Sequence, residues 1–202
     1  GTLTAKKLGA RKAPWLWRLS NAMKFNYLRG WLAFHLVRPI ASAFGLMTAI
    51  GALSIRVKRA NGEWIDYGVV SYRVITNAGV TFLRDDFNNG AAKISNMNYH
   101  GLGTGNTAEA AGDTALVTES TTALNPDSTR ATGTRSTPAS NQFQSVGTLT
   151  FDAGASIVEH GLFSQAATGG GTLWDRSIFS VITMGSGDSL QSTYVLTLTA
   201  GG

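Results

Sequence analysis

The sequence predicts a mainly β protein, an antiparallel β-sandwich of jelly-roll-like type with one short helix and an extended N-terminal arm. Residues 155–163, 172–182 and 190–200 are rich in β-branched and aromatic residues and are bounded by Gly, Ser or Asp, as strands are. The 24 glycines, set with Thr and Ser between short apolar runs, favour turns over long helices. Strand-like segments recur about every ten residues, which is typical of a sandwich.

Charge divides the chain into two parts. Eleven of the 17 Lys and Arg, and none of the 12 Asp and Glu, lie in residues 1–60. We therefore expect a basic, aromatic-rich arm (1–60) and a mildly acidic sandwich body (61–202). Charged residues make up only 14% of the chain, which suggests that partners cover much of its surface. The absence of Cys excludes disulfides and thiolate metal sites.

The first thirty residues alternate cations with aromatic residues. Such a segment suits a docking arm, whose aromatic side chains fill pockets while its cations meet acidic groups. A solvated tail and direct contact with DNA or RNA are the alternatives, and we expect no nucleic-acid partner. The residues expected to bind the partner are Trp15, Trp17, Arg18, Phe25, Tyr27, Arg29, Trp31 and Arg38.

Residues 31–55 form an apolar segment with a single formal charge, Arg38. Its length would allow a membrane span. Because Arg38-Pro39 interrupts it and Gly45 and Gly51 weaken it, we expect no membrane role. The segment should instead lie in a protein–protein groove or cover its own sheet, with a short helix over residues 40–53.

The pair Asn61-Gly62 predicts a hairpin between residues 53–60 and 63–70, with Val57 opposite Asp66. The second strand should continue to residue 75. A short helix should follow, capped by Thr76 or Asn77 and ending at Asn89-Gly90. Its expected apolar face carries Val80, Leu83 and Phe87.

The remaining strands are expected at 93–100, 115–122, 129–134 and 141–151, with a loop over 101–113 and a turn at Asn125-Pro126-Asp127. In the last strand of the chain Tyr194, Leu196 and Leu198 share one face, as in a half-buried strand.

Two motifs suggest chemistry and are better read as turns or loops. Residues 187–190 spell Gly-Asp-Ser-Leu, but neither Asp nor His follows to activate Ser189. Residues 100–105 resemble a phosphate-binding loop, yet position 106 is Asn and no Gly-Lys-Ser/Thr is present.

No residue set selects a metal or a catalytic pair. His100, Asp152 or Asp175 could join Glu159 and His160 as metal ligands, but neighbouring strand residues point to opposite faces. An acid pair for glycoside cleavage could be chosen from Glu159, Asp175 and Asp188, but nothing in their sequence spacing selects two of them. We therefore expect neither an enzyme nor a cofactor. Trp174, Asp175 and Arg176 instead suggest an ion pair with a packed aromatic at a subunit interface.

Five segments resemble structural proteins of tailed bacteriophages: residues 99–105, 112–119, 157–163, 173–179 and 187–197. The resemblance spans roughly residues 76–202, consists of strand and turn residues, and excludes the arm. It implies a virion protein, either a capsid decoration (cement) protein or a tail, neck or fibre-attachment component. Decoration proteins of this type are small sandwiches that often trimerise on the shell and brace neighbouring capsid subunits.

We therefore expect a non-enzymatic capsid decoration protein on the virion surface. Its partners should be the major capsid protein or other virion subunits, and it should form a homo-oligomer, with a trimer favoured. The alternatives are a tail, neck or fibre-adaptor component, and a receptor- or carbohydrate-binding module with Trp64, Trp174 or Tyr99 as sugar platforms.

Overall fold

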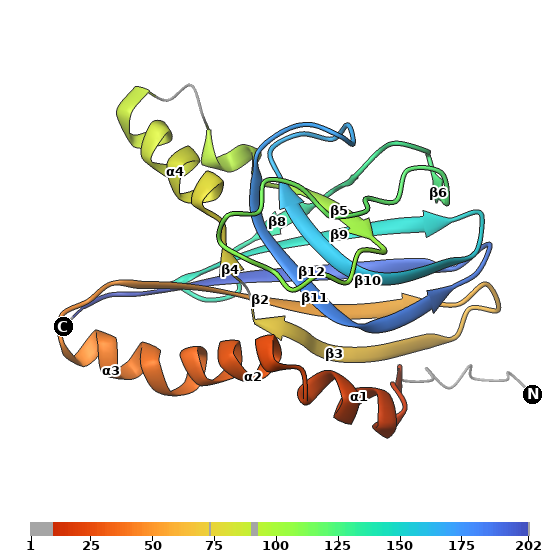
Figure 1. Cartoon of the computed structure of the whole chain (residues 1–202), viewed down its shortest axis with the longest axis horizontal. Coiled ribbons are helices and arrows are strands. Elements are labelled where there is room, and N and C mark those ends of the chain that lie inside the picture. Colours follow the sequence, from red (N-terminus) through yellow and green to blue (C-terminus); the bar gives the residue numbers. More distant parts are fainter. Residues whose placement is uncertain (1–9, 73, 90–92, 202) are drawn as a thin grey trace, which may run out of the picture.

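The chain folds around two β-sheets stacked face to face (Figure 1). The structure, a computed structural model, describes residues 10–72, 74–89 and 93–201, without the side chains of Phe25, Asn26, Val74 and Asn89. The first sheet has the order β1-β3-β2-β12-β9-β6, with β8 also pairing with β9, and the second has the order β4-β11-β10-β5-β7. The strands are β1 (Arg11–Lys12), β2 (Thr48–Lys58), β3 (Trp64–Tyr72), β4 (Val74–Ile75), β5 (Tyr99–Gly103), β6 (Leu124–Asn125), β7 (Ala131–Thr132), β8 (Thr134–Ser136), β9 (Gln142–Phe151), β10 (Ala155–Phe163), β11 (Leu173–Met184) and β12 (Ser189–Thr199).

The helices are α1 (Trp15–Ala22), α2 (Phe25–Leu32), a π-helical turn (Ala33–Val37), α3 (Arg38–Ala43), α4 (Asn77–Asn89) and a 3₁₀ turn (Ile94–Asn96). The first four run along the β3 side of the first sheet, and α4 projects from the opposite side (Figure 1). The main core lies between the sheets, where Leu53 and Val57 of β2 meet Ile157 of β10 and Phe179 of β11. The mainly β prediction is confirmed.

Strand β2 corrects the expected boundary at residue 60. It pairs with β12 along its whole length, from Thr48 opposite Thr199 to Lys58 opposite Ser189, and with β3 on its other side. Leu53, Ile55 and Val57 are fully buried, so their alternation places β2 inside the sheet. The body therefore begins at residue 48. The helix expected over 40–53 is wrong: α3 ends at Ala43, and Gly45 follows with φ +76°.

The expected hairpin exists, but its register differs by one residue. Val57 faces Ile65, and Asp66 faces Arg56. Arg59 N donates to Glu63 O at 2.8 Å, so three residues rather than two connect the strands. The strand does not continue to residue 75, because β4 pairs with β11 in the second sheet.

Helix α4 occupies the expected range, and its expected cap is confirmed. Thr76 Oγ1 accepts a hydrogen bond from Gly79 N at 3.0 Å. The expected packing face is wrong, because Val80 and Phe87 are 57% and 84% exposed. Leu83 does pack against the body as expected, and Phe82, which the prediction did not include, packs beside it.

The long C-terminal strands β9 to β12 lie within two residues of their expected bounds. In β12 Tyr194 is fully buried and Leu198 is 44% exposed, so the shared face is buried only over its inner part. The expected strand at 93–100 is wrong: residues 94–96 form the 3₁₀ turn and β5 begins at Tyr99. Residues 115–134 contain only the short strands β6, β7 and part of β8, because irregular loops lie between them.

The N-terminal arm is not extended over its described part. Residues 15–43, which we call the N-terminal helical segment, are helical except for a break at residues 23–24. Residues 1–9 of the expected arm lie outside the described residues. The helical segment lies against the chain's own body and presents its other side to solvent, which makes it the candidate functional surface.

Candidate docking surface on the N-terminal helices

Asn21 anchors α1 to both sheets. Its Nδ2 donates to the carbonyl of Val70 on β3 at 2.7 Å, and its Oδ1 accepts from the amide of Ser180 on β11 at 2.7 Å. The side chain is 2% exposed, so both backbone groups would lose a partner without it. The start of the helical segment is therefore fixed by buried polar contacts.

Further contacts hold the segment along the body. Trp17 Nε1 donates to Val181 O at 2.7 Å, and the Trp17 ring packs edge-on against Tyr67 with 4.7 Å between ring centroids. Gly30 lies so close to Tyr72 that a Cβ at residue 30 would be 2.6 Å from the Tyr72 Cβ. At the far end Ser42 Oγ donates to Ala200 O at 2.7 Å. Small and polar residues thus face inward.

Large apolar side chains face outward. Leu28, Leu32, Leu36, Ile40 and Phe44 are spaced four residues apart and are 39–79% exposed. Residues four apart form one ridge on a helix surface, the geometry that packs into a groove of another helix. We call these five residues the outward row. Other exposed apolar residues on the same segment and its ends are Trp15, Leu16, Leu19, Met23, Trp31, Val37, Leu46 and Met47.

Six described cations lie on or beside this apolar surface, and four of them have no ion-pair partner among the described residues. Arg11 and Lys12 pair with Glu63 and Asp66 of the hairpin. Arg18, Lys24, Arg29 and Arg38 take part in no ion pair among the described residues. The surface is therefore apolar and positively charged, which favours an acidic partner.

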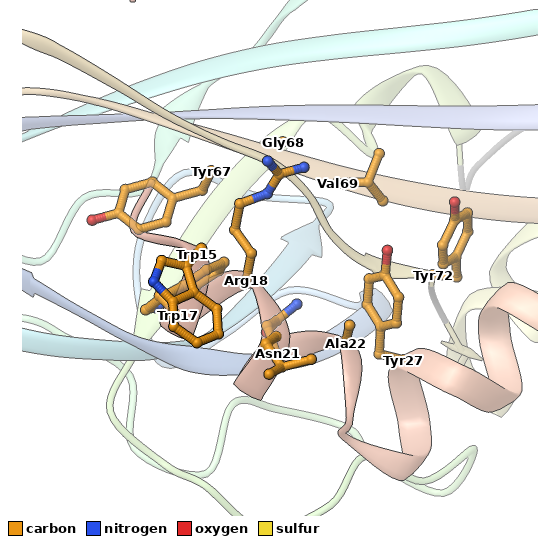
Figure 2. A pocket seen from close by; sticks show the side chains of 11 residues that line it. Trp15, Trp17, Arg18, Asn21, Ala22, Tyr27, Tyr67, Gly68, Val69 and Tyr72 are labelled. Atoms are coloured by element: carbon orange, nitrogen blue, oxygen red, sulfur yellow. The ribbon is translucent and has the colours of Figure 1, made fainter. Parts of the chain in front are cut away.

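A groove of about 580 Å³ separates α1 and α2 from β3. Figure 2 shows Trp15 and Trp17 at one end and Tyr27 and Tyr72 at the other, with the Arg18 side chain reaching between them toward Gly68. Two bulges interrupt the β2–β3 register, one of them at Gly68, whose φ is +69°. Five of the eleven residues that line the groove are aromatic.

The structure brings four of the eight expected arm residues together in one groove. Trp15, Trp17, Arg18 and Tyr27 line the groove. Arg29 and Trp31 are exposed on α2, and Trp31 stacks on His35 with 4.6 Å between rings. Arg38 lies 4.3 Å from the ring centroid of Phe34. The side chain of Phe25 lies outside the described part of the chain.

The expected subunit interface at Trp174, Asp175 and Arg176 is wrong. All three are at most 4% exposed within a single chain, so another subunit cannot reach them. Trp174 Nε1 donates to Tyr194 Oη at 2.8 Å. The expected pair of Asp175 with Arg176 is replaced by ion pairs of Arg176 with Glu159 and Asp113.

Glu159 and Arg176 hold a long loop on the second sheet. Glu159 accepts hydrogen bonds from the amides of Gly105, Val117 and Thr118 at 2.9–3.1 Å. Gly103 and Gly105 leave room for this, because a Cβ at either position would lie 2.5–2.7 Å from Glu159 Oε1. The glycine motif at 100–105 is therefore part of a buried carboxylate site.

A second polar network links the two sheets. His100 Nδ1 lies 2.9 Å from His160 Nε2, and His100 Nε2 lies 2.8 Å from Ser145 Oγ. Ser145 Oγ donates to Asn98 Oδ1 at 2.7 Å, so it accepts from His100 Nε2. His160 and Glu159 interact with different groups, as expected of strand neighbours. No cluster of three metal-ligand side chains occurs within the described ranges.

Ser189 and Asp188 lie at the turn before β12. Asp188 accepts from the amides of Gly185 and Ala60 and pairs with Arg59 at 2.7 Å. Burial alone would raise the Asp188 pKa, but these hydrogen bonds and the Arg59 charge hold it below its usual value. Asp188 therefore links the loop between β2 and β3, through Arg59 and Ala60, to the turn between β11 and β12, through Gly185.

The outward row is the functional feature that sequence reasoning missed. Its signal was available as an apolar residue at every fourth position from 28 to 44.

None of the helices in the described part has the length and hydropathy to cross a membrane. Comparison with family models, curated proteins and solved structures finds no match for this chain.

Proposed function

We propose that the chain is a non-enzymatic structural subunit of a tailed-phage virion that docks on neighbouring subunits through its N-terminal helical segment. The outward row carries this proposal. Its five large apolar side chains are 39–79% exposed along one helical segment, and clusters of exposed apolar side chains mark interaction sites. The resemblance of residues 76–202 to phage structural proteins supplies the virion context.

Within this proposal the chain is a capsid decoration protein with a jelly-roll-like body on the capsid surface. At 1.5 Å per residue the row from Leu28 to Phe44 is about 24 Å long, which suits a standard interface of about 1,600 Å². The major capsid protein or another virion subunit is the partner.

Self-association is part of the proposal and has one favoured geometry. Two helical segments in symmetric contact would bring Arg29 and Arg38 of one copy against those of another, and like charges oppose such contact. We propose instead a head-to-tail trimer, in which the segment of one copy contacts the acidic body of the next.

A tail, neck or fibre-adaptor role uses the same surface and differs in copy number. Gel densitometry of purified virions separates the two roles. A copy number near that of the major capsid protein supports decoration, and a small fraction of it supports the alternative. The carbohydrate-binding alternative is less favoured, because two of its three expected sugar platforms are not free for stacking. Trp174 is buried, and the Arg56 guanidinium lies 5.0 Å from the Trp64 ring centroid.

The test is Leu36→Glu, because Leu36 lies at the centre of the outward row and is 53% exposed. The matched control is Phe87→Glu on α4, which is 84% exposed on another face. Burying a leucine contributes about 1.5–3 kcal/mol, so Leu36→Glu should lower virion incorporation at least about tenfold. Wild-type incorporation of Leu36→Glu, or equal loss in both variants, would refute the proposal.

A further inference from the structure

The polar groups that line the groove of Figure 2 are hydrogen-bond donors. The Arg18 guanidinium and the Tyr27 and Tyr72 hydroxyls form no hydrogen bond with any other described residue, and Figure 2 shows all three in the groove. Burial raises the pKa of Tyr27 and Tyr72, so both hydroxyls keep their protons at neutral pH. The Asn21 side-chain amide already donates to Val70 O and accepts from Ser180 N. The groove therefore offers donors to an acceptor-bearing ligand.

No carboxylate lines the groove. The nearest acidic residues of the hairpin are already matched: Glu63 lies 3.5 Å from Arg11, and Asp66 lies 2.7 Å from Lys12. Arg18 thus remains the uncompensated charge of the groove. A ligand that brings a carboxylate would pair with it at short range.

The groove walls favour a ligand in which an apolar or aromatic group lies beside that carboxylate. Two Trp and three Tyr line the groove, a composition typical of grooves that bind extended or proline-rich peptides. The edge of β3 does not offer free strand pairing here, because Asn21 occupies Val70 O and Asp66 Oδ1 accepts from Gly68 N at 2.8 Å. Recognition must therefore act through side chains.

A nucleic-acid ligand fits less well. A nucleic-acid strand needs a track of cations along its phosphates, and among the described residues that line the groove Arg18 is the single cation.

We infer that this groove binds an extended segment of a neighbouring subunit in which an Asp or Glu adjoins an aromatic residue or proline. Arg18 pairs with the carboxylate, Tyr27 and Tyr72 donate to it or to the adjacent carbonyl, and the Trp15 and Trp17 rings contact the apolar neighbour. The identity of the neighbour as a virion subunit rests on the proposed function, whereas the chemistry of the segment rests on the groove.

The test is selection of random twelve-residue peptides on the full-length protein, followed by titration of the enriched peptides with tryptophan fluorescence as the signal. Peptides with an acidic residue beside an aromatic residue or proline should be enriched. Arg18→Gln should weaken their binding about tenfold. The matched control is Arg29→Gln, which removes an exposed cation outside the groove and should change binding less than about twofold.

Three results would overturn the inference: enriched peptides that lack acidic residues, equal binding by Arg18→Gln, or tighter Arg18-dependent binding of a thymidine oligonucleotide. Arg18 is exposed and forms no described hydrogen bond or ion pair, so its replacement should not alter the melting temperature. If acidic peptides bind but virions lack the chain, the groove inference stands and the proposed function fails. If virions contain the chain but no acidic peptide is enriched, only the groove inference fails.

Discussion

The attachment of the N-terminal helices can be tested at one residue, Asn21. Its side chain joins α1 to β3 and β11 through Val70 O and Ser180 N. Replacing it with alanine removes two hydrogen bonds and leaves two buried backbone groups unsatisfied. Taking about 1–2 kcal/mol for each such group, the lower part of the usual range, Asn21→Ala should lower the free energy of unfolding by about 2–4 kcal/mol.

Urea unfolding gives the first measurement. With a slope of about 2 kcal/mol per molar, the urea midpoint of Asn21→Ala should fall by about 1–2 M. The matched control is Ser20→Ala, because Ser20 is exposed and its Oγ lies 3.4 Å from Ser180 Oγ. That change should cost less than about 0.5 kcal/mol.

Amide exchange gives a local measurement on the same variants. Ser180 N donates to Asn21 rather than to a strand, so its protection against exchange should fall in Asn21→Ala and persist in Ser20→Ala. An unchanged midpoint together with an unchanged Ser180 exchange rate would refute the anchoring role and show that other contacts hold α1.

Three further predictions concern buried charges and glycines. Arg176→Met should destabilise the protein by about 3–5 kcal/mol in urea unfolding, since it leaves Glu159 buried without its cation; adding Glu159→Gln should recover part of the loss. Gly103→Ala should cost at least about 2 kcal/mol, whereas Gly112→Ala, where a Cβ would meet nothing within 4 Å, should be neutral. Asp188→Asn should be less stable than the wild type at neutral pH, and because the folded-state pKa is depressed, this difference should disappear as pH falls below about 4 through that pKa.

The long strands were predictable because their alternation is local. In β12 the buried Leu190, Ser192 and Tyr194 recur at every second position, so the period alone identifies the strand. The same holds for β9, where Leu149 and Phe151 enter the core. Turn geometry is harder to predict from sequence. The loop has one residue more than expected, so Val57 pairs across the strands with Ile65 rather than with the expected Asp66.

The placement of β2 could not be predicted from charge. Its Arg56 and Lys58 point to solvent while Ile55 and Val57 point to the core, so a strand of the sheet shares the basic composition of the arm. A boundary drawn where acidic residues begin therefore fell one strand too late. Composition reports surface chemistry, whereas pairing with β12 depends on contacts far along the chain.

The candidate site was predictable in its residue types and not in its geometry. Aromatic residues and cations without acids indicated docking, and Trp15, Trp17, Arg18 and Tyr27 do meet in one groove. Which side of a helix faces the body depends on tertiary contacts such as those of Asn21, which no periodicity reveals.

The N-terminal helical segment reverses the usual arrangement of a surface helix. Amphipathic helices normally bury their large apolar side chains and expose polar ones. Here Asn21, Gly30 and Ser42 face the body together with the Trp17 ring, while residues such as Leu36 and Phe44 face solvent. Folding alone gains little from that orientation, because the apolar area stays in water. Covering it with a partner would recover the hydrophobic free energy that folding leaves unused, so the segment's orientation is best explained by assembly.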